Sequence, residues 1–233
     1  MSQVHARTAR LIGQDGLEKL RSARVAVFGL GGVGGAAVWG LSRSGVGFLR
    51  LVDCDDVAES NLNRQMVADW ETIGMRKTDA AERMIRRYNR EIMLDKCDLR
   101  ANEQTIPVLC DGVDLVIDAI DDIPAKVGLA VYCTQHGIDI LSSMGTGNKL
   151  RPDAFSIKDL SKTSGDPLAR ILRRKLKDYG ITHLSVCISD ELPARVPQDE
   201  QGKNTPASIA FVPPSAGLVL AGEAVRRLLG RRA

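Results

Sequence analysis

The sequence predicts an α/β protein with a doubly wound, mostly parallel sheet and a C-terminal α+β extension. Short apolar strands alternate with helical segments up to about residue 150, which is typical of a sheet covered by helices on both faces. A glycine-rich turn at 29–34 directly follows the first of these strands. The alternation changes after Gly147, and this change places the extension in the last part of the chain.

The first half begins with a strand, a turn and a helix. Residues 24–29 are β-rich and end in glycine, residues 33–44 have the pattern of a helix, and Gly45 ends that helix. A second strand over 48–52 ends at Asp53. The same criteria predict helices over 75–89, 102–110 and 124–136, the last ended by Gly137, and strands over 92–97, 114–118 and 138–142.

The second half predicts fewer regular elements. They are strands near 155–158 and 182–188, a helix over 167–179, and a final helix that begins after Pro213-Pro214 and ends near Leu229. The segment 193–205 between them is polar and contains chain breakers. Its composition fits a mobile flap and an ordered lid equally well.

Composition and charge exclude several classes of protein. Prolines and charged residues interrupt the apolar stretch 209–229, so it is predicted to be a core helix and not a membrane span. The N-terminal residues lack the apolar region of a secretion signal, so the cytoplasm is the expected compartment. The five cysteines are scattered without a C-x-x-C pair, which argues against a disulfide framework and a four-cysteine zinc site. A net charge of +3 is too small to identify a partner.

The glycine-rich turn and the acid after the second strand predict a Rossmann-like nucleotide site. The turn and the helix that follows it would present backbone amides to phosphate groups. Asp53 lies about 20 residues beyond the turn, where such folds place the acid that accepts the ribose hydroxyls. The glycines expected to contact the nucleotide are Gly29, Gly31, Gly32 and Gly34. A nicotinamide or flavin site would use the same glycines and the same acid.

A polar cluster just beyond Asp53 favours a triphosphate over a redox cofactor. Arg64 and Lys77 are two fixed cations that could hold a triphosphate and stabilise the charge of departing pyrophosphate. Asn61 and Gln65 add two amides to the cluster. The alternative is that Arg64 and Lys77 are ordinary solvated charges on the surface.

The segment Asp118–Asp122 predicts a metal ligand at the edge of the sheet where α/β proteins bind ligands. Mg²⁺ bound to a triphosphate prefers oxygen ligands, and Asp121 is the expected protein carboxylate. Asp122 is expected to cap the helix that begins near Pro124. The alternative is that Asp121 also serves only as a cap.

Together these motifs resemble the adenylyltransferase superfamily that includes ubiquitin-activating enzymes and the adenylylating enzymes of molybdopterin and thiamine synthesis. The resemblance spans residues 24 to about 150. It implies ATP and Mg²⁺ as cofactors, with Asp121 on the metal. The segment 8–13 also resembles one in these relatives, which implies that Arg10 enters the ATP site of a neighbouring subunit, and hence a homodimer. The remaining nucleotide contacts that the resemblance implies are Asp53 on the ribose, Asp55 of the same D-x-D motif, and Asn61, Arg64, Gln65 and Lys77 on the phosphates.

Three later segments resemble the tRNA threonylcarbamoyladenosine dehydratase branch of that superfamily: 158–163, 166–170 and 211–218. This resemblance covers nearly the whole chain and implies ATP-dependent dehydration of a tRNA nucleoside through a carboxyl adenylate. It implies one adenylyltransferase domain over 1–233, with a nucleotide-binding core over 1–150 and a tRNA-binding extension over 151–233. The alternative is adenylylation of the C-terminal glycine of a ubiquitin-like sulfur carrier. The sequence leaves open whether a sulfur-relay (cysteine desulfurase) system is a partner.

The predicted helix over 167–179 has one apolar face and one cationic face. Its cations, which follow i, i+3, i+4, i+7 spacing, are Arg170, Arg173, Arg174 and Lys177. Such a stripe could bind RNA phosphates, although an exposed helix face is usually only solvated. Cys187 lies between two apolar residues of a predicted strand, so we expect an inert core thiol and not a nucleophile.

Overall fold

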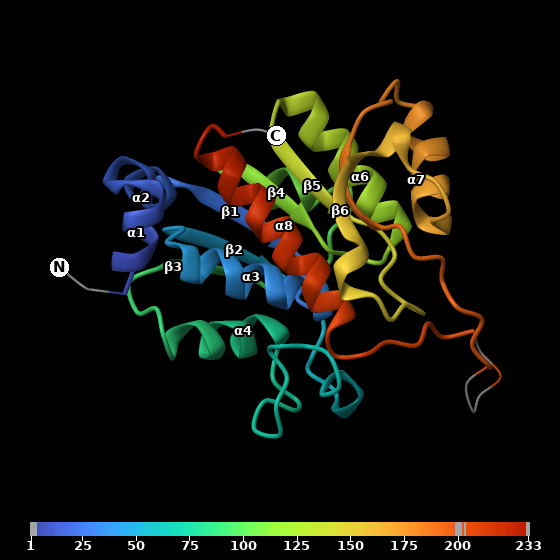
Figure 1. Ribbon diagram of the computed structural model, residues 1–233, viewed down its shortest axis with the longest axis horizontal. Helices are drawn as coiled ribbons and strands as arrows, with labels where there is room; N and C mark the ends of the chain where they lie inside the picture. Colours follow the sequence, from blue (N-terminus) through green and yellow to red (C-terminus); the bar gives the residue numbers. More distant parts are fainter. Residues whose placement is uncertain (1–3, 199–201, 203, 232–233) are drawn as a thin grey trace.

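The computed structural model describes residues 4–198, 202 and 204–231 (Figure 1). Seven strands form one sheet in the order β3-β2-β1-β4-β5-β7-β6. All neighbours are parallel except β6 and β7, which are antiparallel. The strands are β1 (Arg24–Phe28), β2 (Phe48–Val52), β3 (Met93–Cys97), β4 (Leu115–Asp118), β5 (Asp139–Ser143), β6 (Phe155–Asp159) and β7 (Ser185–Ser189).

Helices cover both faces of the sheet, as its mostly parallel order requires. One buried cluster packs α2 (Gln14–Ser22), α3 (Gly32–Ser44), α4 (Lys77–Arg86) and α8 (Val212–Leu228) on one face. The other cluster packs α5 (Ile106–Leu109), α6 (Ile123–His136) and α7 (Pro167–Lys177) on the opposite face. The remaining helical segments are α1 (Ala6–Ile12) and the short 3-10 turns η1 (Glu59–Asn61), η2 (Pro152–Ala154) and η3 (Leu160–Lys162).

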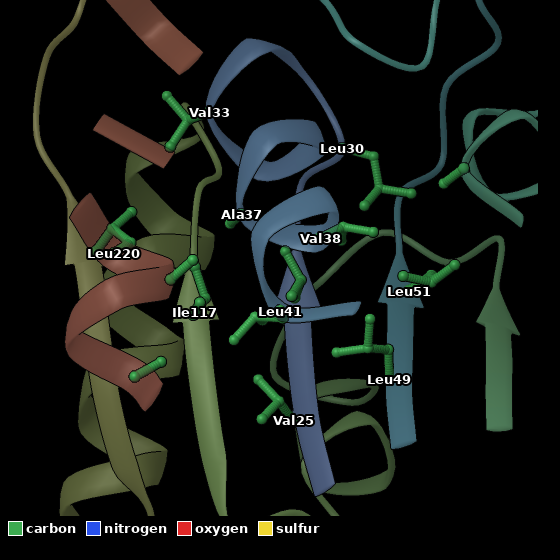
Figure 2. Packing of buried hydrophobic residues seen from close by; sticks show 14 of the residues in the cluster. Val25, Leu30, Val33, Ala37, Val38, Leu41, Leu49, Leu51, Ile117 and Leu220 are labelled. Carbon is green, nitrogen blue, oxygen red and sulfur yellow. The ribbon is translucent and has the colours of Figure 1, made fainter. Parts of the chain in front are cut away.

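The central strands are mostly apolar because both faces of the sheet are buried. In β1, Val25 and Val27 belong to one cluster, whereas Ala26 and Phe28 belong to the other. This follows from the two-residue period of a strand. Figure 2 shows side chains of β1, β2 and β4 on the same side of the sheet as those of α3 and α8, including Leu41 and Leu220. The burial of these side chains fixes the positions of the strand ends.

The extension after residue 150 is part of the same sheet and core. β7 lies beside β5, and β6 forms the edge beyond it. Helix α8 packs closely on α3, because a Cβ atom at Gly217 would lie 2.1 Å from the carbonyl oxygen of Val33. Residues far apart in the chain therefore share one core, and the predicted division of roles between 1–150 and 151–233 stays a prediction.

The predicted fold class and order of elements are confirmed, with several differences at the ends. The helix predicted over 75–89 is shorter, and the one over 102–110 contains only Ile106–Leu109. Before it, Asn102 accepts hydrogen bonds from the backbone amides of residues 104 and 105, which stabilise a turn instead. Helix α8 begins before the two prolines, since proline needs no amide donor in a first turn. The N-terminal helices α1 and α2 were not predicted.

One further difference concerns exposure. The helix predicted over 167–179 would place Tyr179 on its apolar face, but α7 ends at Lys177 and Tyr179 is 58% exposed. Among the described residues, no helix has the length and apolar character needed to cross a membrane. Part of the predicted polar segment 193–205, namely residues 199–201 and 203, lies outside the described residues, as do residues 1–3 of the N-terminus.

Candidate active site

A cavity of about 530 Å³ opens at the carboxyl ends of β1, β2, β4 and β5. This is the edge at which open α/β sheets bind ligands. The cavity brings together most of the residues that the sequence nominates for nucleotide binding. Those that line it are Gly29, Gly31, Gly32, Asp53, Asp55, Arg64, Gln65, Lys77 and Asp121.

The glycine turn is held by close backbone packing that excludes side chains. Gly29 has φ +84°, and a Cβ atom there would lie 2.7 Å from the carbonyl oxygen of Ala119. A Cβ atom at Gly34 would lie 1.7 Å from the carbonyl oxygen of Gly29. Gly34 does not line the cavity, so its visible role is close packing of helix on strand. The turn places the first residues of α3 against the cavity.

Asp53 connects the glycine turn to the second strand. Its carboxylate accepts the backbone amide of Leu30 at 2.6 Å through Oδ2 and that of Asp55 at 2.9 Å through Oδ1. The side chain is almost fully buried. These contacts hold the carboxylate in place while each oxygen keeps a further lone pair, as the predicted contact with ribose requires.

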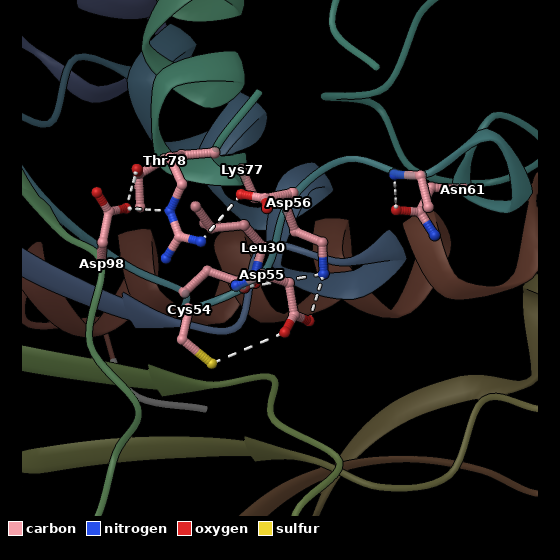
Figure 3. Close-up of polar contacts among 11 residues, drawn as sticks. Leu30, Cys54, Asp55, Asp56, Asn61, Lys77, Thr78 and Asp98 are labelled. Carbon is pink, nitrogen blue, oxygen red and sulfur yellow. Dashed lines mark hydrogen bonds and ion pairs between the residues drawn. The ribbon is translucent and has the colours of Figure 1, made fainter. Parts of the chain in front are cut away.

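Lys77 is the first residue of α4, and its ammonium points to the acidic pair beside the cavity. Its Nζ atom lies 2.8 Å from Oδ2 of Asp55 and 3.8 Å from Oδ1 of Asp53 (Figure 3). The hydrogen bond from Lys77 lowers the pKa of Asp55, although burial acts in the opposite direction. Asp55 is therefore anionic at neutral pH and holds a buried cation at the cavity wall. Lys77 is not one of the solvated charges of the alternative interpretation.

Arg64 and Gln65 reach the cavity from the turn that follows η1. The Arg64 guanidinium donates to the carbonyl oxygen of Ser60 at 3.0 Å and to Oδ1 of Asn63 at 2.8 Å. Gln65 is buried, and its Oε1 atom has no hydrogen-bond partner among the described residues. Buried acceptors without a partner are rare, so this atom fits a donor from a ligand or water. Both residues are positioned for a polar ligand.

Asn61 stabilises this turn and does not line the cavity. Its Oδ1 atom accepts the backbone amide of Ala58 at 3.0 Å (Figure 3). Its carbonyl oxygen accepts the amides of Arg64 and Gln65 at 3.1 and 2.9 Å. Asn61 thus positions the residues that do line the cavity, and its own predicted contact with phosphate stays a prediction.

Asp121 is an unpaired carboxylate in the cavity wall just beyond β4. Within the described part of the chain it makes no hydrogen bond and no ion pair, whereas its neighbour Asp122 accepts the amide of Ala125 at 2.9 Å and caps α6 as predicted. Across the described residues, no three Asp, Glu, His or Cys side chains gather as a metal cluster. The donor set is one carboxylate, which fits Mg²⁺ that takes its other ligands from phosphates and water.

A buried network beneath this loop was not found from the sequence. Lys126 on α6 donates from Nζ to Oδ2 of Asp118 at 2.7 Å, to Oγ of Ser142 at 3.1 Å and to the carbonyl oxygen of Ser143 at 3.0 Å. Asp118 also accepts the amide of Ile120 at 3.2 Å. The network joins β4, β5 and α6 directly behind Asp121. Lys126 lies in an apolar helix, where the sequence contains no signal for its buried partner.

The far side of the cavity was also not predicted in detail. It is formed by the loop after β5, by the first turn of α7 and by a segment before α8. The lining residues from these three parts are Ser143, Met144, Gly145, Thr146 and Gly147, then Leu168, and then Thr205, Pro206, Ala207 and Ser208. The cavity therefore continues past Asp121 into the C-terminal extension.

Comparison with known proteins identifies the family to which this nucleotide-type fold belongs. A family model described as the ThiF family matches residues 5–233. The chain belongs to the ThiF family. This confirms the family predicted from the sequence, and the match includes both the glycine turn and the C-terminal extension.

Individual members of the ThiF family resemble the chain over nearly its whole length. The tRNA threonylcarbamoyladenosine dehydratase of Bacillus subtilis (strain 168) is 40% identical over 98% of this chain and 96% of that protein. The crystal structure of the E. coli tRNA N6-threonylcarbamoyladenosine dehydratase in complex with AMP has a TM-score of 0.92 and 30% identity, with 98% and 95% of the two chains covered. The ATP complex of that E. coli protein has a TM-score of 0.91 and the same identity and coverage.

Arg10 lies outside the cavity of its own chain in this ThiF family protein. It is exposed in the last turn of α1 and does not line the cavity. This position leaves its side chain available to a second copy of the chain. The predicted role of Arg10 in a neighbouring subunit stays a prediction.

The four cations of α7 differ in their exposure to solvent. Arg170, Arg174 and Lys177 are exposed. Arg173 is half-buried, and its guanidinium donates to the carbonyl oxygens of Leu160 at 3.1 Å and Thr163 at 2.8 Å, and also to the Thr163 hydroxyl. The expectation of four equivalent surface cations is therefore corrected, because Arg173 anchors η3 to α7.

Cys187 is a core residue of β7, as expected. The side chain is fully buried, and burial raises the pKa of its thiol to about 12. A neutral thiol at physiological pH is a poor nucleophile. The burial and neutral state of Cys187 are therefore those of a structural thiol.

Proposed function

We propose that this ThiF family protein is an ATP-dependent tRNA threonylcarbamoyladenosine dehydratase. It would activate the threonyl carboxylate of the modified nucleoside with ATP and then close a ring, with net loss of water. The main support is that one cavity combines the glycine turn, two cations and an unpaired carboxylate. Further support is that the similarity to proteins of this name extends over the C-terminal extension.

The nucleotide would occupy the side of the cavity formed by β1 and β2. Asp53, held by the amides of Leu30 and Asp55, would accept the ribose hydroxyls. The amides of the turn and of the start of α3 would face the phosphates. Lys77 and Arg64 would place two positive charges near the phosphate chain.

In the first step, an oxygen of the threonyl carboxylate attacks the α-phosphorus of ATP, and the bond to the bridging oxygen of pyrophosphate breaks. Lys77 and Arg64, with Arg10 from a second copy of the chain, would stabilise the negative charge that develops on the phosphates. Preorganisation supports this assignment, because Asp55 and Asp53 already hold the Lys77 ammonium in place.

In the second step, a ureido nitrogen of the same nucleoside attacks the activated acyl carbon. The bond from that carbon to the AMP oxygen breaks, AMP leaves, and the nitrogen loses its proton to solvent. Both reacting groups belong to one nucleoside, so their proximity lowers the barrier. No enzyme nucleophile is needed, which agrees with the neutral, buried thiol of Cys187.

Asp121 would hold Mg²⁺ together with phosphate oxygens. Its carboxylate lines the cavity without a partner among the described residues, which supports this role. When bound, the metal would neutralise part of the triphosphate charge. The buried network behind Asp121 would keep the loop between β4 and α6 in place.

The tRNA would bind on the side of the C-terminal extension. The exposed cations Arg170, Arg174 and Lys177 lie on α7, and Leu168 in the first turn of this helix lines the cavity. A nucleoside could therefore enter the cavity while flanking phosphates contact α7. ATP would then bind residues 1–150, and the acceptor would bind mainly residues 151–233.

The assembly would be a homodimer that acts on tRNA in the cytoplasm. The exposed position of Arg10, outside the cavity of its own chain, supports the dimer. The proposed ring closure transfers no sulfur. A cysteine desulfurase would therefore be a binding partner and not a source of reacting atoms.

The direct test is to incubate the protein with ATP, Mg²⁺ and tRNA that carries threonylcarbamoyladenosine, and to weigh the released nucleoside by mass spectrometry. A nucleoside lighter by one water, formed only with ATP, is the expected result. An unchanged mass would refute the proposed reaction. Exchange of pyrophosphate into ATP that depends on a carrier protein ending in Gly-Gly, and not on tRNA, would support carrier adenylylation instead.

A further inference from the structure

Two consecutive residues join the separate parts of the chain that form the far side of the cavity. Gly145–Gly147 line the cavity after β5, and Asn148 and Lys149 follow them directly. We call Asn148-Lys149 the elbow. One elbow residue contacts the segment before α8, and the other contacts the first turn of α7. Both of these parts contribute lining residues.

Asn148 forms hydrogen bonds with two parts of the segment between β7 and α8. Its backbone amide donates to the carbonyl oxygen of Ala207 at 2.8 Å, and its Oδ1 atom accepts the amide of Ala207 at 2.7 Å. Its carbonyl oxygen accepts the amide of Ala194 at 2.7 Å. Asn148 has φ +60°, and asparagine tolerates this left-handed backbone better than most residues. The wall at 205–208 is therefore attached to the elbow by specific bonds.

The preceding glycine permits this attachment. A Cβ atom at Gly147 would lie 2.7 Å from Cβ of Pro206. Pro206 therefore packs directly on the loop that follows β5. The next residue, Ala207, donates its backbone amide to the side chain of Asn148.

Lys149 links the same loop to the start of α7. Its ammonium is buried and donates to the carbonyl oxygen of Gly145 at 2.8 Å, with Oδ2 of Asp166 at 3.5 Å. The other oxygen of Asp166 accepts the amide of Ala169 at 2.9 Å and caps α7. One lysine thus connects the cavity wall at Gly145 with the helix that presents Leu168 to the cavity.

The order of strands places this wall away from the nucleotide side. The glycine turn and Asp53 follow β1 and β2, whereas the elbow follows β5, and β4 with Asp121 lies between them. A ligand on the elbow side would meet the nucleotide close to Asp121. Changes at the elbow should therefore affect the acceptor more than ATP.

We infer that Asn148 and Lys149 are positioning residues for the acceptor nucleoside: they hold the segment 205–208 and the first turn of α7 as the wall against which the threonyl carboxylate is placed. The inference rests on the proposed function. Neither residue lines the cavity, so neither is a catalytic residue.

The test compares steady-state kinetics for modified tRNA and for ATP in the full-length protein. Asn148→Gly keeps the left-handed backbone but removes the bond from Oδ1 to Ala207, and Lys149→Met removes the ammonium with little change in volume. We expect each to raise KM for tRNA at least about fivefold, the effect of one lost buried hydrogen bond, with KM for ATP nearly unchanged. Lys149→Met also leaves Asp166 buried without its partner, so this variant should have a lower free energy of unfolding as well. Asn148→Asp keeps the acceptor and should restore a KM close to that of the wild type.

The matched control is Arg151→Ala, two residues beyond the elbow. The Arg151 side chain is exposed and pairs with Asp153, so its loss should leave both KM values unchanged. Hydrogen exchange gives a second readout without catalysis. The amide of Ala207 should exchange faster in Asn148→Gly than in the wild type, and not in Arg151→Ala.

The outcomes separate the inference from the proposed function. If the wild type does not convert modified tRNA, the proposed function is wrong and the inference is overturned with it. If the wild type converts tRNA but both elbow variants keep its KM for tRNA, only the inference is wrong. An equal rise of both KM values, with a lower unfolding temperature, would indicate a general structural role and would also overturn it.

Discussion

The Nζ atom of Lys126 lies 2.7 Å from Oδ2 of Asp118, and both side chains are completely buried. The pair connects the end of β4 with α6 directly behind the loop that carries Asp121. Removal of one partner from a buried pair leaves a charge without compensation, which costs far more than the loss of an exposed ion pair. This pair therefore offers a test of how the fold supports the site.

Lys126→Met should lower the free energy of unfolding by about 3–5 kcal/mol, because Asp118 would remain buried without its partner. Denaturant unfolding measures this change. The matched control is Lys158→Met, whose exposed partner is Asp190, and it should cost about 1 kcal/mol or less. An equal loss of unfolding free energy in the two variants would contradict the view that burial makes the Lys126–Asp118 pair more costly to break.

Asp121→Asn should reduce tRNA-dependent formation of AMP at least about 100-fold, the usual order for loss of a group that stabilises charge in the transition state. The fold should be unaffected, because Asp121 has no partner among the described residues. Asp122→Asn is the control: asparagine also caps helices, so activity and stability should both be retained. Full activity of Asp121→Asn would refute the metal-binding role.

Lys77→Met should abolish adenylylation with a modest change in stability. Asp55, its nearest partner at 2.8 Å, is 59% exposed and would be hydrated by solvent after the substitution. The lowered pKa of Asp55 gives a pH prediction. Stability from this contact is present above the usual pKa of an aspartate and is lost as pH falls through the lower, folded-state value. The Lys77→Met variant should therefore lose less stability on acidification than the wild type, as measured by urea unfolding.

Cys187→Ala should leave the rate of tRNA dehydration unchanged, and the thiol should resist alkylation at pH 8 in the folded protein. The pKa of about 12 makes the neutral thiol the folded-state form. The unfolded thiol ionises near its ordinary value, so stability from the neutral, buried thiol falls as pH rises through the range between the two values. Cys187→Ala should flatten this alkaline loss of stability, and a loss of activity would contradict the assignment of Cys187 to the core.

Replacement of Arg170, Arg174 and Lys177 by alanine should weaken tRNA binding and reduce its salt dependence, because fewer counterions would be released. Binding titrations at several salt concentrations measure both effects. Arg173→Ala is expected to behave differently. It removes charge-assisted hydrogen bonds to Leu160 and Thr163, so its main effect should be a loss of stability of about 1.5–3 kcal/mol. An unchanged salt dependence of the triple variant would contradict RNA binding by α7.

Local residue patterns were sufficient to predict much of the nucleotide side. The turn at 29–34, Asp53 after the second strand, and the cap Asp122 depend on backbone geometry within a few residues or on one strand–turn–helix unit. Parallel strands meet at one edge, so their polar ends were expected to converge. That expectation is confirmed by Asp53 and Asp121, which follow β2 and β4 and line the same cavity.

Contacts between distant residues could not be predicted in the same way. In the elbow, Asn148 accepts a hydrogen bond from the amide of Ala207. In the core, Lys126 donates hydrogen bonds to Asp118 and Ser142. Arg173 is half-buried because it donates a hydrogen bond to Leu160 of η3, which precedes α7 in the chain. Helical spacing alone placed Arg173 with the exposed cations, and this was wrong.

The sequence by itself determined the fold class, the family and the candidate nucleotide-binding residues, most of which line the cavity. These follow from periodicity and from short motifs whose geometry is local. Only the tertiary structure decided which charges are buried, which segments form the far wall of the cavity, and which cations remain exposed. The physical reason is that burial and long-range hydrogen bonds arise when separate segments pack on one sheet, and no local pattern specifies those partners.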